Sequence, residues 1–270
     1  MRIGKNKLFK YIPFEDIDCP ALSLYLEEMA SNGWLLYDIV AGISKFKKTN
    51  PQEIKFSIDI FDEDANSKKQ YKEYLEMCSA AGWEHICSFS KCQIFCTKDK
   101  NAIPIQTDLN LELKNMVGNV LFFIVMPLLP LVPAFISNVN LQYSINNIVN
   151  INNANISDFF LSILLIVFFI AAFLKVIIEI IINTTWFFKT KKSLKNNNEI
   201  KYIGLKSFKS KMNIRNYFII YCLIILILML VPENYYSPIY MYCSCVLIVI
   251  LTISISIMSI VYFARTLKEI

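Results

Sequence analysis

The sequence YLEEMASNGW at Tyr25–Trp34 returns, with changes, as YLEMCSAAGW at Tyr74–Trp83, 49 residues further along the chain. The same offset places Phe46 on Phe95 without a gap. Similarity at one fixed spacing is the sequence sign of an internal repeat. We therefore predict that the N-terminal part of the chain contains two copies of one structural unit.

Each predicted unit, about 5–50 and 54–99, runs strand, helix, strand, strand. In the first, Asp18 is placed to cap a helix and Pro20 stands just inside its start. Apolar residues then recur at helical spacing, and alternating stretches follow as a hairpin. The expected product is an α+β soluble domain over 1–115, with a mostly antiparallel sheet and two helices on one face.

A glycine followed by tryptophan ends each predicted helix, as Gly33-Trp34 and Gly82-Trp83. Glycine suits the left-handed backbone at a helix end. The tryptophans could form an aromatic binding platform. Because both copies keep the pair at the same local position, we interpret all four residues as structural anchors, with the indole rings filling the core.

The second half of the chain has a different composition. Of the 49 charged residues, 32 lie within residues 1–115, and no Lys or Arg occurs from Met116 to Leu174. The whole chain is 55% apolar, above the roughly 45–50% of soluble domains. Residues 116–270 are therefore predicted to form an all-α membrane domain of four helices. The expected spans are 117–136, 159–182, 215–231 and 239–263.

Basic residues predict the orientation of these spans. The connection 183–216 carries nine Lys and Arg residues and one acidic residue. The connections 137–158 and 232–238 carry no Lys or Arg. Basic loops stay on the cytoplasmic side. The N-terminus also lacks the apolar region of a secretory signal. We expect a multi-pass protein of the bacterial cell membrane with both termini in the cytoplasm. The lysines are attributed to topology and to anionic lipid headgroups, not to nucleic acid.

Two features inside the predicted spans could have a role in function. Lys175 and Glu179 are spaced i, i+4 and share a helix face, and ionisable residues inside a span are candidate functional residues. The alternative is a mutually neutralising pair whose polar ends reach the headgroups. Pro127, Pro130 and Pro133 predict a kinked or broken first helix, which either lines a transport site or ends near the outer surface.

A metal, cofactor or catalytic site is not predicted. The single histidine, His85, has Cys87, Cys92 and Cys96 nearby, but the spacing differs from that of paired zinc ligands. The cysteines are interpreted as free thiols that act as small apolar side chains. The sequence has no phosphate-binding loop and no nucleotide fingerprint. We therefore expect no enzyme activity and no cofactor.

The helix end Met29–Trp34, the aromatic strand that follows it to Phe46, and the second Gly82-Trp83 turn resemble a bacterial family known as domain of unknown function 2812. The resemblance covers about residues 5–110. It implies a domain that is often joined to membrane helices and often encoded beside regulators of the PadR type. It implies no reaction, and this chain departs from the family in the cysteine content of its second unit.

These observations lead to two hypotheses of function. The first is a regulatory or adaptor protein of the cell membrane, whose cytosolic domain binds a protein or a small ligand. The alternative is a transporter or transporter-accessory subunit in which Lys175 and Glu179 line a path. The expected partners are the lipid bilayer, a cytosolic protein and a second copy of the chain.

Overall fold

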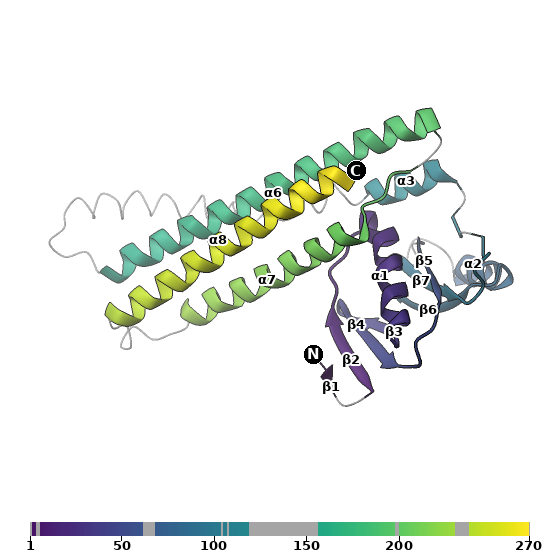
Figure 1. Ribbon diagram of the computed structural model, residues 1–270, viewed down its shortest axis with the longest axis horizontal. Coiled ribbons are helices and arrows are strands. Elements are labelled where there is room, and N and C mark those ends of the chain that lie inside the picture. The colour runs from purple at the N-terminus through teal and green to yellow at the C-terminus, as the bar shows by residue number, and fades with distance from the viewer. Residues whose placement is uncertain are drawn as a thin grey trace. The chain divides into compact units, whose positions relative to one another are not determined.

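The computed structural model (Figure 1) divides the chain into two compact units. The first unit contains Met1–Val120, Trp186–Met212 and Glu269–Ile270, and the second contains Leu121–Thr185 and Asn213–Lys268. Thus a segment from the second half of the sequence belongs to the first unit. The structure describes residues 2–3, 6–61, 68–103, 105–106, 108–118, 156–197, 200–229 and 238–269.

The first unit contains two antiparallel sheets, and the α+β class predicted for it is confirmed. The larger sheet has the order β1-β2-β4-β3 and the smaller one the order β5-β7-β6. The strands are β1 (Arg2–Ile3), β2 (Lys7–Tyr11), β3 (Trp34–Val40), β4 (Ile43–Lys48), β5 (Lys55–Ile60), β6 (Glu84–Phe89) and β7 (Cys92–Thr97). The helices between them are α1 (Cys19–Ser31) and α2 (Lys68–Ala80), followed by α3 (Leu109–Gly118).

The two sheets pair their strands in equivalent registers. Leu8 lies opposite Phe46 in the larger sheet, and Ser57 lies opposite Phe95 in the smaller one. In each sheet a register shift interrupts the hairpin, between Leu36 and Asp38 and between His85 and Cys87. All of these positions differ by the offset of 49 residues. Descent of the two halves from one duplicated unit stays a prediction.

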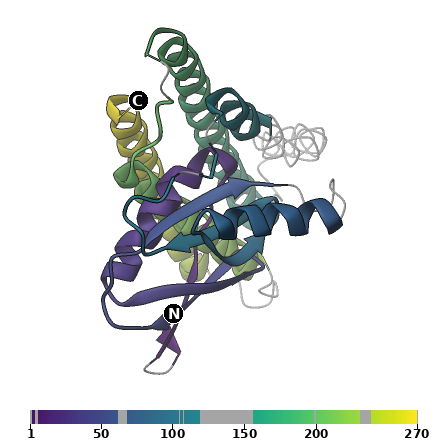
Figure 2. The same cartoon turned by 90° about the vertical axis from the view of Figure 1, so that its right-hand side faces the viewer.

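The expectation of one sheet with both helices on one face is wrong. Side chains of α1 share a core cluster with Ile94 of β7, whereas side chains of α2 pack with Phe95. Neighbouring residues of a strand point to opposite faces, so α1 and α2 cover opposite faces of the smaller sheet. Figure 2 shows α2 lying across the strands on the side toward the viewer. The prediction of a single covered face fails because β7 carries apolar side chains on both faces. Ile94 and Phe95 point to opposite faces, and both are fully buried.

The main core of the first unit includes residues from both sheets, from α1 and from a distant helix. Leu22 and Leu26 of α1 pack with Phe46 and Phe56, and the same cluster contains Phe208. Phe208 belongs to α7 (Leu205–Met229), and its side chain is 0% exposed. Burying an aromatic side chain of this size contributes on the order of 2 kcal/mol or more. The segment 205–212 is therefore part of the core.

The connection 183–216, predicted as a basic loop, is mostly helical. Helix α6 (Ile156–Asn197) continues well past the predicted span 159–182, and α7 begins at Leu205. Buried Ile200 and Ile203 lie in the non-helical stretch between the two helices. The Trp186 indole donates a hydrogen bond of 2.6 Å to the Lys201 carbonyl, which ties that stretch to the end of α6.

The described part of the second unit consists of the remaining lengths of α6 and α7 together with α8 (Pro238–Glu269) up to Lys268. The Tyr221 and Thr252 hydroxyls join α7 to α8 at 2.8 Å. Among the described residues, one helical stretch, Ile250–Glu269, is long and apolar enough to cross a membrane. This finding suggests association with a membrane. The four-helix membrane domain is not confirmed, and the predicted span 117–136 lies outside the described residues from position 119 onward.

Candidate functional site

The entry to α1 carries the polar residues of the candidate site. A single 3-10 turn, η1 (Asp16–Asp18), leads into the helix, and Pro20 stands in its first turn. The Asp18 carboxylate accepts a 3.0 Å hydrogen bond from the Glu15 amide, which closes the turn. Asp18 is the N-cap residue as predicted, but its side chain makes no capping hydrogen bond to the helix. This leaves the carboxylate directed at a partner from elsewhere in the chain.

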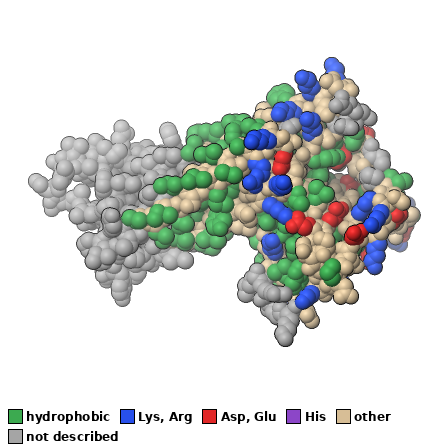
Figure 3. Space-filling model, in the orientation of Figure 1, with side chains coloured by type: hydrophobic (Ala, Val, Ile, Leu, Met, Phe, Trp, Pro, Cys, Tyr) green, Lys and Arg blue, Asp and Glu red, His purple; other side chains and the backbone are tan. Residues whose placement is uncertain are grey.

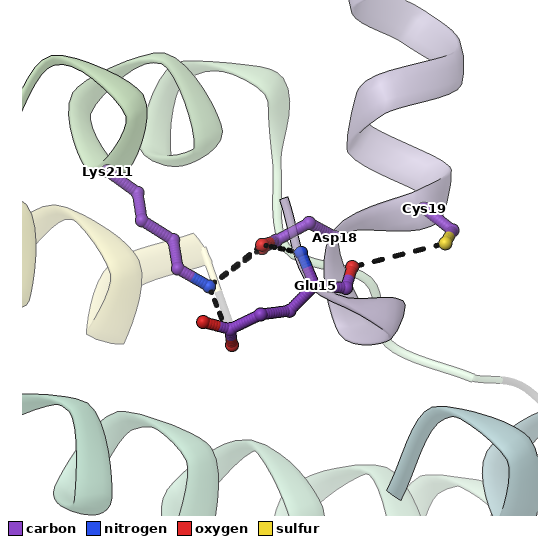
Figure 4. A network of polar contacts seen from close by, with 4 residues as sticks. All are labelled: Glu15, Asp18, Cys19 and Lys211. Atoms are coloured by element: carbon purple, nitrogen blue, oxygen red, sulfur yellow. Dashed lines mark hydrogen bonds and ion pairs between the residues drawn. The ribbon is translucent and has the colours of Figure 1, made fainter. Parts of the chain in front are cut away.

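That partner is Lys211 of α7, 193 residues away in the sequence. Its ammonium lies 2.8 Å from Asp18 Oδ2, 3.1 Å from Asp18 Oδ1 and 3.2 Å from Glu15 Oε2. Figure 4 shows the lysine reaching the two carboxylates, which converge on it from the turn before α1. We call Glu15, Asp18 and Lys211 the ion-pair cluster.

The ion-pair cluster is buried. The side chains are 4% exposed for Lys211, 7% for Glu15 and 0% for Asp18. Burial raises the pKa of the Asp18 carboxyl, while the nearby Lys211 charge acts in the opposite direction. Removing one member of a buried ion pair costs about 3–5 kcal/mol, because the remaining charge is left without compensation. The cluster therefore makes the docking of residues 205–212 strongly dependent on charge.

Three other contacts hold residues 202–209, at and just before the start of α7, in the first unit. Lys209 pairs with Glu28 of α1 at 2.6 Å. The ring of Phe208 meets that of Tyr25 edge-on, with the centroids 6.0 Å apart. The Tyr202 hydroxyl donates to Glu112 of α3 at 3.0 Å. Thus apolar burial, one half-exposed ion pair and one polar contact surround the buried cluster.

Six of the nine basic residues of the connection therefore fall into two groups. Lys209 and Lys211 are used inside the first unit, whereas the side chains at the end of α6 are exposed. Figure 3 shows basic side chains gathered where α6 ends. The exposed lysines of this helix end are Lys189, Lys191, Lys192 and Lys195.

Two thiols lie next to the ion-pair cluster. Cys19, the first residue of α1, has its sulfur 3.8 Å from that of Cys92 in β7. The Cys92 thiol also donates to Asp16 Oδ1 at 3.8 Å, and both cysteines are free and buried. The contact with Cys92, burial and the nearby carboxylates of Asp16 and Asp18 raise the pKa of the Cys19 thiol well above its usual value.

A cavity of about 260 Å³ opens beside Cys19, within the first unit. Its walls come from α1, β5 and α3, with Tyr202 at one side. The ionisable residues that line it are Cys19, Glu27, Asp59, Glu112 and Tyr202. Burial raises the pKa of Glu112, and the hydrogen bond from Tyr202 opposes that shift. Cavities of this size admit small molecules of a few heavy atoms.

The structure does not place Lys175 and Glu179 in this site. Both lie in the part of α6 that belongs to the second unit. Glu179 is half-buried, and the Lys175 side chain is outside the described residues, as are Pro127, Pro130 and Pro133. Their predicted role in function stays a prediction.

The four anchors occupy equivalent positions at the ends of α1 and α2. Gly33 and Gly82 have positive φ angles of 79° and 87°. At Gly33 an added Cβ would also meet the Thr49 carbonyl at 2.8 Å. Trp83 is 5% exposed, and its indole donates to the Ile103 carbonyl at 2.8 Å, while Trp34 packs half-buried against the main core.

His85 and the cysteines near it in sequence have separate partners. His85 Nε2 lies 3.2 Å from Gln93 Oε1 and 3.3 Å from Ser88 Oγ. Cys92 instead faces Cys19 and Asp16. Across the described ranges, no group of three His, Cys, Asp or Glu side chains is arranged to hold a metal ion.

Sequence reasoning missed the ion-pair cluster. It attributed Lys211 to membrane topology, together with eight other basic residues, and Asp18 to helix capping. One signal was present: three acidic residues, Glu15, Asp16 and Asp18, stand within four positions directly before an apolar helix. So many acids at the edge of a core require a cationic partner, but the sequence does not say which lysine supplies it.

Comparison with known proteins gives the family. Residues 23–125 match the family described as "Protein of unknown function (DUF2812)". This part of the chain belongs to the DUF2812 family. The resemblance seen in the sequence is thereby confirmed. The DUF2812 match includes most of α1, strands β3 and β4 of the larger sheet, the whole smaller sheet, α2 and α3. No curated protein and no solved structure shows significant similarity to the chain.

Proposed function

We propose that this DUF2812 protein is a membrane regulatory or adaptor protein. Its first unit faces the cytoplasm and binds a protein or a small ligand there, and four helices with both termini inside hold it in the bacterial cell membrane. The observation that carries the proposal is the buried contact of Lys211 with Glu15 and Asp18. A flexible tether would be enough to anchor a domain and would need no buried charge on the connecting segment.

The position of Lys211 supports a regulatory role. Helix α7 runs without interruption from Leu205 to Met229, so its first residues lie in the first unit and the rest belongs to the second. A ligand that changes the docking of 205–212 would move the start of a helix that continues into the proposed membrane domain. Such coupling requires that the ligand bind the docked and released arrangements with different affinity.

The contact between the start of α7 and the region of α1 joins basic groups on one side to acidic groups on the other, and this also supports partner binding. Release of the segment would expose Glu15, Asp18 and Glu28 on one side and Lys209 and Lys211 on the other. Each group would then need a new partner or water, because a desolvated charge without one is unfavourable. A cytosolic protein with complementary charges would stabilise the released arrangement.

The proposal is tested by crosslinking in intact cells, followed by quantitative mass spectrometry of proteins that copurify with the full chain. Three chains are compared: wild type, Lys211→Met, and Lys206→Met as the matched control. Lys206 lies on the same helix but is exposed. The expected result is a soluble protein whose recovery changes several-fold with Lys211→Met and stays constant with Lys206→Met.

A fourth chain, lacking residues 1–115, shows whether the first unit is the binding region. It should lose the same soluble protein while remaining in the membrane fraction. Identical recovery of all soluble proteins by the wild type and by the shortened chain would refute the adaptor proposal.

A further inference from the structure

We propose that Cys19 and Cys92 form a disulfide when a small hydroperoxide enters the cavity beside Cys19. The sulfurs are 3.8 Å apart, although the residues are separated by 73 positions in the sequence. A disulfide needs about 2.05 Å between sulfurs, so the two must approach by roughly 1.8 Å. Small movements of the first turn of α1 and of the start of β7 would be enough.

Access distinguishes the two thiols. Cys19 is 2% exposed and Cys92 is 3% exposed, so neither is open to a bulky reagent. Cys19 nevertheless lines the cavity of about 260 Å³, whereas Cys92 is not among its lining residues. A molecule of two heavy atoms, such as hydrogen peroxide, fits this space. The geometry therefore assigns the first reaction to Cys19 and the second to Cys92.

In the first step the Cys19 sulfur attacks one peroxide oxygen. A sulfur–oxygen bond forms, the oxygen–oxygen bond breaks, and the thiol proton leaves with the second oxygen as water. The product is a sulfenic acid on Cys19, with the sulfur oxidised and the peroxide reduced. The reacting form of a cysteine is the thiolate, and Cys19 holds its proton tightly in this environment, so the step is slow at neutral pH.

In the second step the Cys92 sulfur attacks the Cys19 sulfur. A sulfur–sulfur bond forms, the sulfur–oxygen bond breaks, and hydroxide leaves. Asp16 Oδ1, 3.8 Å from the Cys92 sulfur, is placed to accept its proton and pass it to the hydroxide as a second water. The sum is two thiols and one peroxide giving one disulfide and two waters.

The test uses the full-length protein in detergent, reduced and then exposed to hydrogen peroxide. Remaining thiols are alkylated after unfolding, and peptides are identified by mass spectrometry. The expected result is a crosslinked Cys19–Cys92 peptide, a loss of alkylation at both positions, and recovery of both after dithiothreitol. In Cys92→Ser, Cys19 should instead accumulate as a sulfenic acid that reacts with dimedone.

Cys96→Ser is the matched control, because Cys96 is a more exposed thiol on the same strand. This variant should keep the Cys19–Cys92 crosslink at wild-type yield. Full alkylation of Cys19 and Cys92 after a peroxide treatment that oxidises Cys96 would overturn the proposal. The wild-type measurement needs no substitution. It therefore tests the Cys19–Cys92 crosslink even if a variant fails to fold.

Discussion

Lys211 is the residue on which the docking of the 205–212 segment depends most strongly. Its side chain is 4% exposed and contacts the carboxylates of Glu15 and Asp18, whose side chains are 7% and 0% exposed. A buried ion pair adds little stability over a well-packed apolar substitute, yet losing one member is costly. The cluster is therefore a specific point at which a single charge determines whether the segment stays in place.

Replacing Lys211 by Met should destabilise the first unit by about 3–5 kcal/mol, because two buried carboxylates lose their cation. The chain has three tryptophans, and Trp34, Trp83 and Trp186 all lie in the first unit. Tryptophan fluorescence during heating therefore reports on that unit. The expected decrease in Tm is on the order of 10 °C.

Two control chains complete this measurement. Lys206→Met should leave Tm nearly unchanged, since Lys206 is exposed. Combining Lys211→Met with Glu15→Gln and Asp18→Asn should restore most of the lost Tm, because no uncompensated charge stays buried. A decrease that the triple change does not reduce would show that packing, not charge, explains the effect.

Two cysteines of the smaller sheet, the buried Cys87 and the half-buried Cys96, predict a loss of stability at alkaline pH. Burial, with a smaller contribution from Asp38, raises the pKa of Cys87 from 9.0 to about 12. Burial and Glu84 raise the pKa of Cys96 from 9.0 to about 11. The unfolded chain thus releases these protons at lower pH than the folded one, so the free energy of unfolding decreases as the pH rises above 9.

Tm by tryptophan fluorescence, measured as the pH is raised from about 8 to about 11, tests this prediction. It should decrease steadily, and Cys96→Ala should make the decrease shallower while leaving Tm near neutral pH almost the same. A pH dependence that is unchanged in Cys96→Ala would assign the alkaline effect to other groups, such as Tyr74, whose pKa is also raised by burial.

At the scale of elements, the start of α7 is held by its apolar face as well as by charge. Phe208 is 0% exposed and Met212 is 5% exposed, and both belong to the main core. Phe208→Ala should cost about 3–5 kcal/mol through the cavity it leaves. Trypsin should then cut faster after Lys206 and Lys209, as the segment spends more time released.

Phe188→Ala is the control for this proteolysis, because Phe188 is 64% exposed in the same unit. Its cleavage pattern should match that of the wild type when peptides are quantified by mass spectrometry. Equal cleavage of Phe208→Ala and wild type would mean that the segment remains docked without its aromatic side chain.

Much of the element content could be read from the sequence, for physical reasons. The repeated Gly-Trp pairs predict where α1 and α2 end, because glycine adopts the positive φ that a helix end needs. Alternation predicts the hairpins. The layering could not be read from the sequence. In β7 the apolar Ile94 is followed directly by the apolar Phe95, and this pattern alone does not reveal that helices lie on both faces of the strand.

The candidate site was beyond sequence reasoning for a different reason. The positive-inside rule already explains a lysine in the 183–216 connection, so the pattern offers no reason to separate Lys211 from Lys206. Only the three-dimensional fold shows that one of these side chains is buried and the other exposed. The acidic residues before α1 indicate that a cation is needed, but no local pattern shows that it is Lys211, 193 residues away from Asp18.

At the scale of the whole molecule, the proposed topology makes a direct prediction. A fluorescent protein fused after residue 270 should fluoresce, and alkaline phosphatase fused there should be inactive, since the C-terminus is expected inside the cell. Phosphatase fused within the connection 137–158, which has no Lys or Arg, should be active. An active phosphatase at the C-terminus would contradict the four-span arrangement with both ends inside.

The position of Lys211 in a continuous helix has a consequence for how the chain can vary in length. One residue added between Leu205 and Lys211 would turn the helix by about 100° and carry the ammonium away from Asp18 and Glu15. The ionic contact thus sets the rotational phase of α7, and with it the direction in which every later side chain of that helix points. Insertions within the two helical turns from Leu205 to Lys211 should therefore be rejected.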